Sequence, residues 1–209
     1  MSARVCIVDY GVGNRRSVEK ALNKVGIGTI VSSSTEQIGA ADGLVIPGVG
    51  AFPPAIARMR ELGLDRAIIA AAERGTPILG ACLGMQLLFD YSDEHGGAEG
   101  LGLLAGNVVA LKAGQNKLPH IGWSAVEWSG DSPLASNLTQ GTWFYHVHSY
   151  VAVAADPTVV IGRSTYGGHF TSVVAQNNIY GVQFHPEKSS ADGLRMLSNF
   201  GAICEAGRQ

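Results

Sequence analysis

The sequence predicts an α/β fold, in which a mostly parallel central sheet is flanked by helices and carries additional antiparallel strands. First, short apolar runs alternate with helical patterns over 4–89, which is typical of βαβ units. Second, the pattern changes to shorter strands and turns after residue 102. Third, a chain of 209 residues can form one domain with a substantial core, and no stretch reads as an interdomain linker. We therefore expect a single domain over 1–209.

The first half of the chain is expected to form the parallel part of the sheet. Its opening run RVCIV is short and apolar, as buried strands are. Apolar residues then recur at helical spacing after Ser17, and Gly26 ends that helix. A second helical region breaks near Gly63. The predicted strands are 4–10, 27–31, 43–47 and 77–81, and the predicted helices are 17–25, 51–74 and a segment from Cys82 to Phe89.

The second half is expected to supply the antiparallel strands. It begins with a polar, glycine-rich loop over 90–102, and short strands and turns follow up to residue 126. The alternating and β-branched segments beyond it predict strands over 142–151, 158–162, 170–175 and 179–184. An amphipathic helix is expected over 191–205.

Composition argues against several classes of protein. The formal net charge of −2 gives no electrostatic footprint for nucleic acid or an anionic membrane. No stretch approaches the roughly 18 consecutive apolar residues of a membrane helix, and the first residues do not begin a secretory signal, so we expect a cytoplasmic protein. Only 15% of the residues are charged. That low value fits either a surface covered by a partner or dilution by glycine and alanine.

Cys82 is the residue on which the functional prediction depends. It lies between Gly80 and Gly84, where the fourth strand meets a helix, and small neighbours let the chain turn sharply there. We expect this turn to hold the thiol in a strained, exposed position at the carboxyl end of the strand. The N–H groups of the following helix favour the thiolate, which makes Cys82 a candidate nucleophile. Cys6 and Cys204 are expected to be packing residues.

His185 and Glu187 are the expected partners of this nucleophile. Pro186 biases the preceding residue towards extended geometry, so the imidazole and the carboxylate can point the same way. In a Cys-His-Glu arrangement the imidazole takes the thiol proton and the carboxylate sets its tautomer. Backbone N–H groups then hold the oxyanion that forms on attack at an acyl carbon. The three residues together predict acyl-transfer chemistry.

Other motifs give weaker signals. The glycines of 47–50 permit a turn that presents N–H groups to a ligand at a strand end. His146 and His148 alternate along one predicted strand, but the sequence identifies no third ligand, so we expect structural roles and no metal site. His120 has no partner that the sequence identifies. We expect no cofactor.

The motifs together resemble the class I, or triad, glutamine amidotransferases, and the resemblance extends over essentially the whole chain. The segment GACLGMQ resembles the nucleophile elbow of that family, PGVG its oxyanion turn, and HPE the rest of the triad. The resemblance implies that Cys82 attacks the side-chain amide of glutamine, His185 shuttles the proton, and Glu187 orients His185. It implies an oxyanion site formed by Val49, Gly50 and Leu83. It implies glutamine-binding roles for Gly50, Leu83, Gln86, Glu94, His148, Ser149 and Tyr150.

Three stretches are more specific within the family. YGVGN, PHIGW and HPEKS resemble the glutaminase subunits of imidazole glycerol phosphate synthases. In that group Asn14, Trp123, Tyr145 and Lys188 would lie at or near the face that meets the cyclase subunit, a (β/α)8 barrel. Arg15 and Arg16 stand where an apolar residue is common, and Ser124 stands where asparagine is frequent.

The resemblance implies a heterodimeric enzyme of histidine biosynthesis. Ammonia released from glutamine would cross to the cyclase, which would form imidazole glycerol phosphate and AICAR, with glutamate as the other product. Since this chain has no phosphate-cradling loop, the phosphorylated substrate would bind the partner. A glutaminase serving another synthase, such as anthranilate synthase, is the nearest alternative. A thiol hydrolase of the α/β-hydrolase type is disfavoured because its acid normally precedes its histidine, and the intact triad argues against an inactive binding module.

Overall fold

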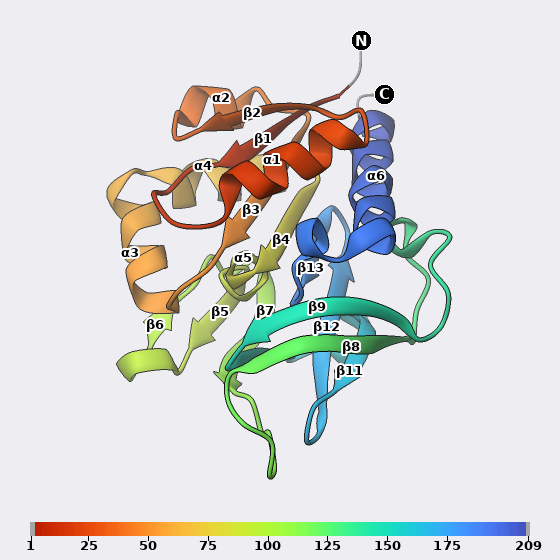
Figure 1. Cartoon of the computed structure of the whole chain (residues 1–209). Helices are drawn as coiled ribbons and strands as arrows, with labels where there is room; N and C mark the ends of the chain where they lie inside the picture. Colours follow the sequence, from red (N-terminus) through yellow and green to blue (C-terminus); the bar gives the residue numbers. More distant parts are fainter. Residues whose placement is uncertain (1–2, 208–209) are drawn as a thin grey trace.

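The computed structural model describes residues 3–207 (Figure 1). The strands are β1 (Arg4–Val8), β2 (Gly28–Ser32), β3 (Gly43–Gly48), β4 (Ile78–Cys82), β5 (Phe89–Ser92), β6 (Ala98–Glu99), β7 (Leu104–Ala110), β8 (His120–Trp128), β9 (Thr142–His148), β10 (Tyr150–Ala154), β11 (Val160–Thr165), β12 (His169–Gln176) and β13 (Ile179–Val182). The α-helices are α1 (Arg15–Lys24), α2 (Thr35–Gly39), α3 (Phe52–Glu61), α4 (Leu64–Glu73), α5 (Leu83–Gln86) and α6 (Ser190–Ala206). Short 3-10 turns are η1 (Glu94–Gly96), η2 (Pro133–Ala135), η3 (Pro157–Val159) and η4 (Pro186–Lys188).

The strands form two sheets. The larger sheet has nine strands in the order β2-β1-β3-β4-β13-β12-β11-β8-β9, and the smaller has four in the order β10-β7-β5-β6. The large sheet is parallel from β2 to β13 and antiparallel from β13 to β9. The predicted α/β class is confirmed, and the antiparallel strands extend the sheet beyond its parallel half (Figure 1).

Both faces of the parallel half are covered, which explains its uninterrupted apolar strands. On β1, Cys6 and Val8 pack into a core formed with α2, α3 and α4. Val5 and Ile7 point to the opposite face and pack with α1 and α6. Side chains alternate between the faces of a strand, so a single short apolar run contributes to both cores.

The register of the parallel strands brings the carboxyl ends of β3, β4 and β13 side by side. Gly48 at the end of β3 lies opposite Cys82 at the end of β4. On the other side of β4, Ala81 lies opposite Val182 of β13. The chain that leaves β13 therefore reaches His185 beside the end of β4. Three segments that are far apart in the sequence meet at one edge of the sheet.

Several predicted boundaries are wrong. The helix after Cys82 ends at Gln86, and Phe89 begins β5, so the expected loop over 90–102 contains β5, η1 and β6. The apolar run that ends at Phe89 is buried throughout, and burial on all sides gives no periodicity that distinguishes helix from strand.

The expected single strand over 142–151 is two strands. Ser149 separates β9, which pairs with β8, from β10, which pairs with β7 in the other sheet. Helix α2 was not predicted. None of the helices in residues 3–207 has both the length and the apolar character that crossing a membrane requires.

Candidate active site

The turn at Cys82 is strained at the cysteine itself. Its backbone has φ 54° and ψ −112°, a region that costs a non-glycine residue about 1–3 kcal/mol. The flanking glycines are needed for a different reason. A Cβ atom at Gly84 would lie 1.7 Å from the carbonyl oxygen of Ile46, and one at Gly80 would lie 2.5 Å from the carbonyl oxygen of Gly84. Gly84 thus lets the turn pack directly against β3, and Gly80 lets α5 pack directly against β4.

The thiol is less accessible than the sequence suggested. We expected an exposed cysteine, but Cys82 is only 5% exposed. Strand β9 passes over it, and Sγ lies 3.7 Å from the carbonyl oxygen of Val147, which can accept a hydrogen bond from the thiol. The amide of Gln183 lies 3.9 Å from Sγ on the other side. Cys82 forms part of the wall of a cavity of about 260 Å³, so a small substrate reaches it from within that cavity.

His185 lines the same cavity, and Glu187 lies behind it. The His185 Nδ1 atom is 3.0 Å from Oε1 of Glu187, and the side chains are 4% and 1% exposed. A carboxylate can only accept a hydrogen bond, so Nδ1 carries the proton and donates it. Ser189 also holds the turn, because its hydroxyl donates to the carbonyl of His185 at 2.7 Å.

The charge state of His185 follows from these neighbours. Burial alone would lower the pKa of the ring, but hydrogen bonds to Cys82 and Glu187, and the negative charges of both groups, raise it from 6.5 to about 10. His185 is therefore held as an imidazolium beside Cys82 and Glu187, which is the form that a histidine acid needs in a site with a cysteine nucleophile.

All seven residues expected to bind glutamine line the cavity. Two of them also connect its walls. Gln86 donates from Nε2 to the carbonyl of Tyr150 at 2.9 Å, which ties the end of α5 to β10. Glu94 accepts from the backbone N–H of Phe52 at 2.7 Å, which ties η1 to the start of α3. The wall also contains Pro119 and Val147, which the sequence analysis did not single out.

The turn 47–50 lies at the cavity as expected. Val49 and Gly50 line it together with Leu83. Gly50 has φ +104°, a conformation that glycine adopts without strain and other residues rarely do. Val49, Gly50 and Leu83 therefore belong to the same cavity wall as Cys82.

The four residues expected at an interface are distributed around this site. Trp123 and Tyr145 are cross-strand neighbours on the outer face of β8 and β9, with ring centroids 5.9 Å apart. Trp123 is 45% exposed, and Ile121 and Trp143 on the same face are 61% and 57% exposed. The remaining two are Asn14, beside a small cavity that also touches Glu187, and the exposed Lys188 at the active-site cavity.

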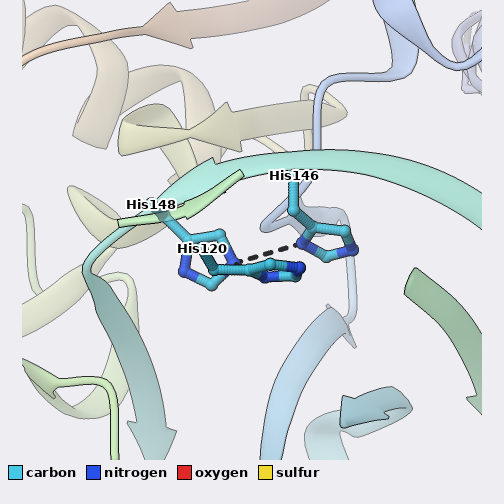
Figure 2. Close-up of side chains that lie close together, drawn as sticks. All are labelled: His120, His146 and His148. Atoms are coloured by element: carbon cyan, nitrogen blue, oxygen red, sulfur yellow. Dashed lines mark hydrogen bonds between the residues drawn. The ribbon is translucent and has the colours of Figure 1, made fainter. Parts of the chain in front are cut away.

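The histidine that the sequence analysis left without a partner lies with the other two. In β8 and β9, His120 is paired directly with His148, and both rings point inward with that of His146 (Figure 2). His120 thus supplies the third ring nitrogen that the sequence analysis could not place beside His146 and His148. Strand pairing between β8 and β9 brings the three rings together, which residue spacing alone did not reveal.

The remaining cysteines pack in the core as expected. Cys6 and Cys204 are fully buried, and burial raises the pKa of Cys6 to about 11 and that of Cys204 to about 12. Such thiols stay protonated at neutral pH and are poor nucleophiles.

Comparison with known proteins agrees with this geometry. The sequence model of the family "Glutamine amidotransferase class-I" matches residues 6–204. The chain is 47% identical over 199 residues to the imidazole glycerol phosphate synthase subunit HisH of Moorella thermoacetica, covering 95% of this chain and 94% of that protein. It is 46% identical over 198 residues to HisH of Aquifex aeolicus, covering 94% and 95%.

Solved structures show the same fold at lower identity. PurLQS from Thermotoga maritima aligns with a TM-score of 0.79 and 22% identity, over 97% of this chain and 99% of that one. The family match spans both the Cys82 turn and the His185–Glu187 pair, and the similarity to the HisH proteins extends along almost the full chain. The chain belongs to the class I glutamine amidotransferase family.

Proposed function

We propose that this chain is the glutaminase subunit of an imidazole glycerol phosphate synthase and works as one glutamine amidotransferase domain. The observation that carries the proposal is the meeting of Cys82, His185 and Glu187 at one cavity, in a chain 47% identical to HisH proteins. The reaction belongs to histidine biosynthesis, and we place it in the cytoplasm.

The catalytic cycle follows from the charges of the triad. The Cys82 thiolate attacks the Cδ carbon of the glutamine side chain, and electrons move onto the amide oxygen. The His185 imidazolium then gives its proton to the departing nitrogen, which leaves as ammonia. A glutamyl thioester remains on Sγ. Neutral His185 next takes a proton from water, whose oxygen attacks the thioester to release glutamate and restore the ion pair. Glu187 holds Nδ1–H throughout.

The cavity supplies binding and charge stabilisation. Backbone N–H groups at Val49, Gly50 and Leu83 are the proposed donors to the oxyanion, since these residues form the wall next to Cys82. The proposed glutamine contacts are the cavity-lining set Gly50, Leu83, Gln86, Glu94, His148, Ser149 and Tyr150. A cavity of about 260 Å³ suits one amino acid rather than a nucleotide.

The ammonia acceptor binds a second protein in this proposal. Strand β9 reaches the cavity through Val147 and His148, and its outer face with β8 exposes aromatic side chains. An apolar, low-charge surface is suited to docking and to shielding ammonia from water. We assign Asn14, Trp123, Tyr145 and Lys188 to the contact with a (β/α)8-barrel cyclase subunit, in a heterodimer.

Glutamate release from glutamine tests the proposal. It is measured for the purified chain alone, with the matching cyclase subunit, and with cyclase plus its nucleotide substrate. We expect strong stimulation in the complete mixture. Full activity that the cyclase does not change would assign the glutaminase to another synthase, and co-purification with a chorismate-using enzyme would identify anthranilate synthase. Absence of activity in every mixture would contradict the proposal.

A further inference from the structure

The inner face of β8 and β9 carries three histidines that the catalytic cycle does not use as acids or bases. His120, His146 and His148 are 2%, 0% and 6% exposed. Nε2 of His148 lies 3.3 Å from Nδ1 of His120 and 3.2 Å from Nδ1 of His146. Figure 2 shows the three rings gathered beneath β9. Three ring nitrogens thus converge in the protein interior.

Hydrogen bonds among the three rings cannot pair all three of these nitrogen atoms. A neutral imidazole has one N–H donor and one lone pair, each directed along a single line in the ring plane. Nε2 of His148 therefore offers either one proton or one lone pair to two neighbouring Nδ1 atoms, and only one of the two contacts can be a good hydrogen bond. Unpaired buried polar atoms cost free energy, so the cluster is incomplete as a hydrogen-bond network.

We propose that His120, His146 and His148 form a binding site for a divalent transition-metal ion of the zinc type. A cation that accepts three lone pairs satisfies all three converging nitrogens at once. Three imidazoles are a common zinc ligand set, with water at the fourth position. One nitrogen of each ring lies within 4.8 Å of one nitrogen of each other ring. Two of the separations, 3.2 and 3.3 Å, match the roughly 3.3 Å between ligands of a tetrahedral ion with 2.0–2.1 Å bonds.

Neighbouring groups prepare the rings for this role. Ser124 Oγ lies 3.1 Å from Nε2 of His120. A ligating histidine commonly donates its second N–H to such a partner, which leaves Nδ1 of His120 free to bind the ion. Burial also lowers the pKa of all three rings, and the neutral imidazole is the form that ligates.

Binding requires a local adjustment and an entry route. The rings of His120 and His146 are 21° from parallel, so they must turn about their Cβ–Cγ bonds until both lone pairs meet the ion. This torsion is broad for histidine. His148 lines the active-site cavity, which gives the ion a path inward and places the bound metal next to the proposed glutamine site. We therefore expect metal binding and glutamine binding to affect each other.

The test uses metal-free full-length protein in which Cys82→Ser removes the competing thiolate. Zinc is titrated by calorimetry, and cobalt is titrated while the visible absorption of tetrahedral Co²⁺ is recorded. We expect one ion per chain. His146→Phe should weaken binding by at least about 100-fold, because an aromatic ring of similar shape removes the ligand but keeps the contacts with Phe170 and Phe184. His169→Gln, on an exposed histidine, is the matched control and should bind as the parent does.

A second measurement does not depend on the folding of a variant. In the Cys82→Ser protein, zinc should shift the ring-nitrogen NMR signals of His120, His146 and His148 and leave those of His95 and His169 unchanged. Absence of stoichiometric binding, or equal binding by His146→Phe and its parent, would overturn the proposal. Zinc-dependent shifts confined to other histidines would do the same.

Discussion

His185 and His148 lie on the wall of the same cavity, yet they differ in charge. Burial by itself favours the neutral form of both rings and would lower the pKa of each. For His148 burial dominates, with further lowering from neighbouring histidines, and the pKa falls to about 3. For His185 the hydrogen bonds and charges of Cys82 and Glu187 exceed the effect of burial, and the pKa rises to about 10. The nature of the neighbours, rather than burial, therefore decides which histidine can carry a proton in catalysis.

The turn at Cys82 and the strand that carries His146 and His148 also differ in backbone conformation. Cys82 has a positive φ at the junction of β4 and α5, whereas His146 and His148 lie on a regular antiparallel strand. Strain and paired charges occur together at the proposed catalytic residues, and functional sites are where proteins commonly keep both. The histidine cluster has neither, which fits a role in ligation better than one in proton transfer.

The most severe test of this comparison removes Cys82, the proposed nucleophile and one of the two neighbours that raise the pKa of His185. Cys82→Ala should reduce glutamine-dependent synthesis by at least about 10⁴-fold, because no thioester can form. Ammonia-dependent synthesis by the complex should persist, since the acceptor reaction belongs to the cyclase. Both rates are measured at saturating substrate. Loss of both activities in a folded complex would falsify the division of labour.

A subtler change neutralises the carboxylate and leaves the nucleophile. Glu187→Gln should lower kcat for glutamine hydrolysis by roughly 10²–10⁴-fold, because the amide no longer fixes the charge and tautomer of His185. In the parent protein the ring keeps its proton as the pH rises from 6.5 to about 10. In the variant the ring should lose it within that window.

NMR titration of the His185 ring nitrogens follows this change directly. Glu99→Gln, which alters an exposed carboxylate, serves as the control and should leave the titration of His185 as it is in the parent. An unchanged pKa in Glu187→Gln would mean that Cys82 alone holds the proton on His185.

The exposed charge of Lys188 should affect binding to the cyclase and should leave the charge states of His148 and His185 unchanged. Lys188→Ala should weaken binding to the cyclase by about tenfold, in the range expected of an interface charge. The unfolding free energy should change by less than about 0.5 kcal/mol because Lys188 is exposed. Binding is measured by calorimetry and stability by urea denaturation, with Lys20→Ala on α1 as the control. Unchanged affinity together with unchanged nitrogen transfer would remove Lys188 from the interface.

The smallest expected effect is on stability, when glycine and alanine are compared at position 82 and at position 146. At position 82, the glycine variant should have the higher free energy of unfolding, by up to about 1 kcal/mol over the alanine variant. The reason is that glycine adopts φ 54° without strain. At position 146, in a regular strand, alanine should exceed glycine by about 0.5–1 kcal/mol. Urea denaturation of the four variants gives both differences. A preference for alanine at both positions would show that the turn at Cys82 stores no strain.

The sequence predicted the site correctly where the interacting residues are close together along the chain. His185, Pro186 and Glu187 are consecutive, so the order of residues along the chain was enough to place the ring beside the carboxylate. Cys82 could be singled out because it lies between Gly80 and Gly84 where a strand meets a helix, and small neighbours allow a sharp turn there. The thiol was nevertheless expected to be exposed, since nothing near it in the sequence indicates that β9 passes over it.

The sequence by itself determined the α/β class, the order of most elements and the candidate triad, because hydrophobic periodicity, turn residues and short motifs act over a few residues. Only the tertiary structure decided that 142–151 divides between two sheets and that His120 joins His146 and His148. These features depend on which strands pair and in what register, and the free energy that selects a pairing comes from side chains distant along the chain. A pattern read along one strand carries no information about its neighbour, so the histidine cluster became visible only in the folded protein.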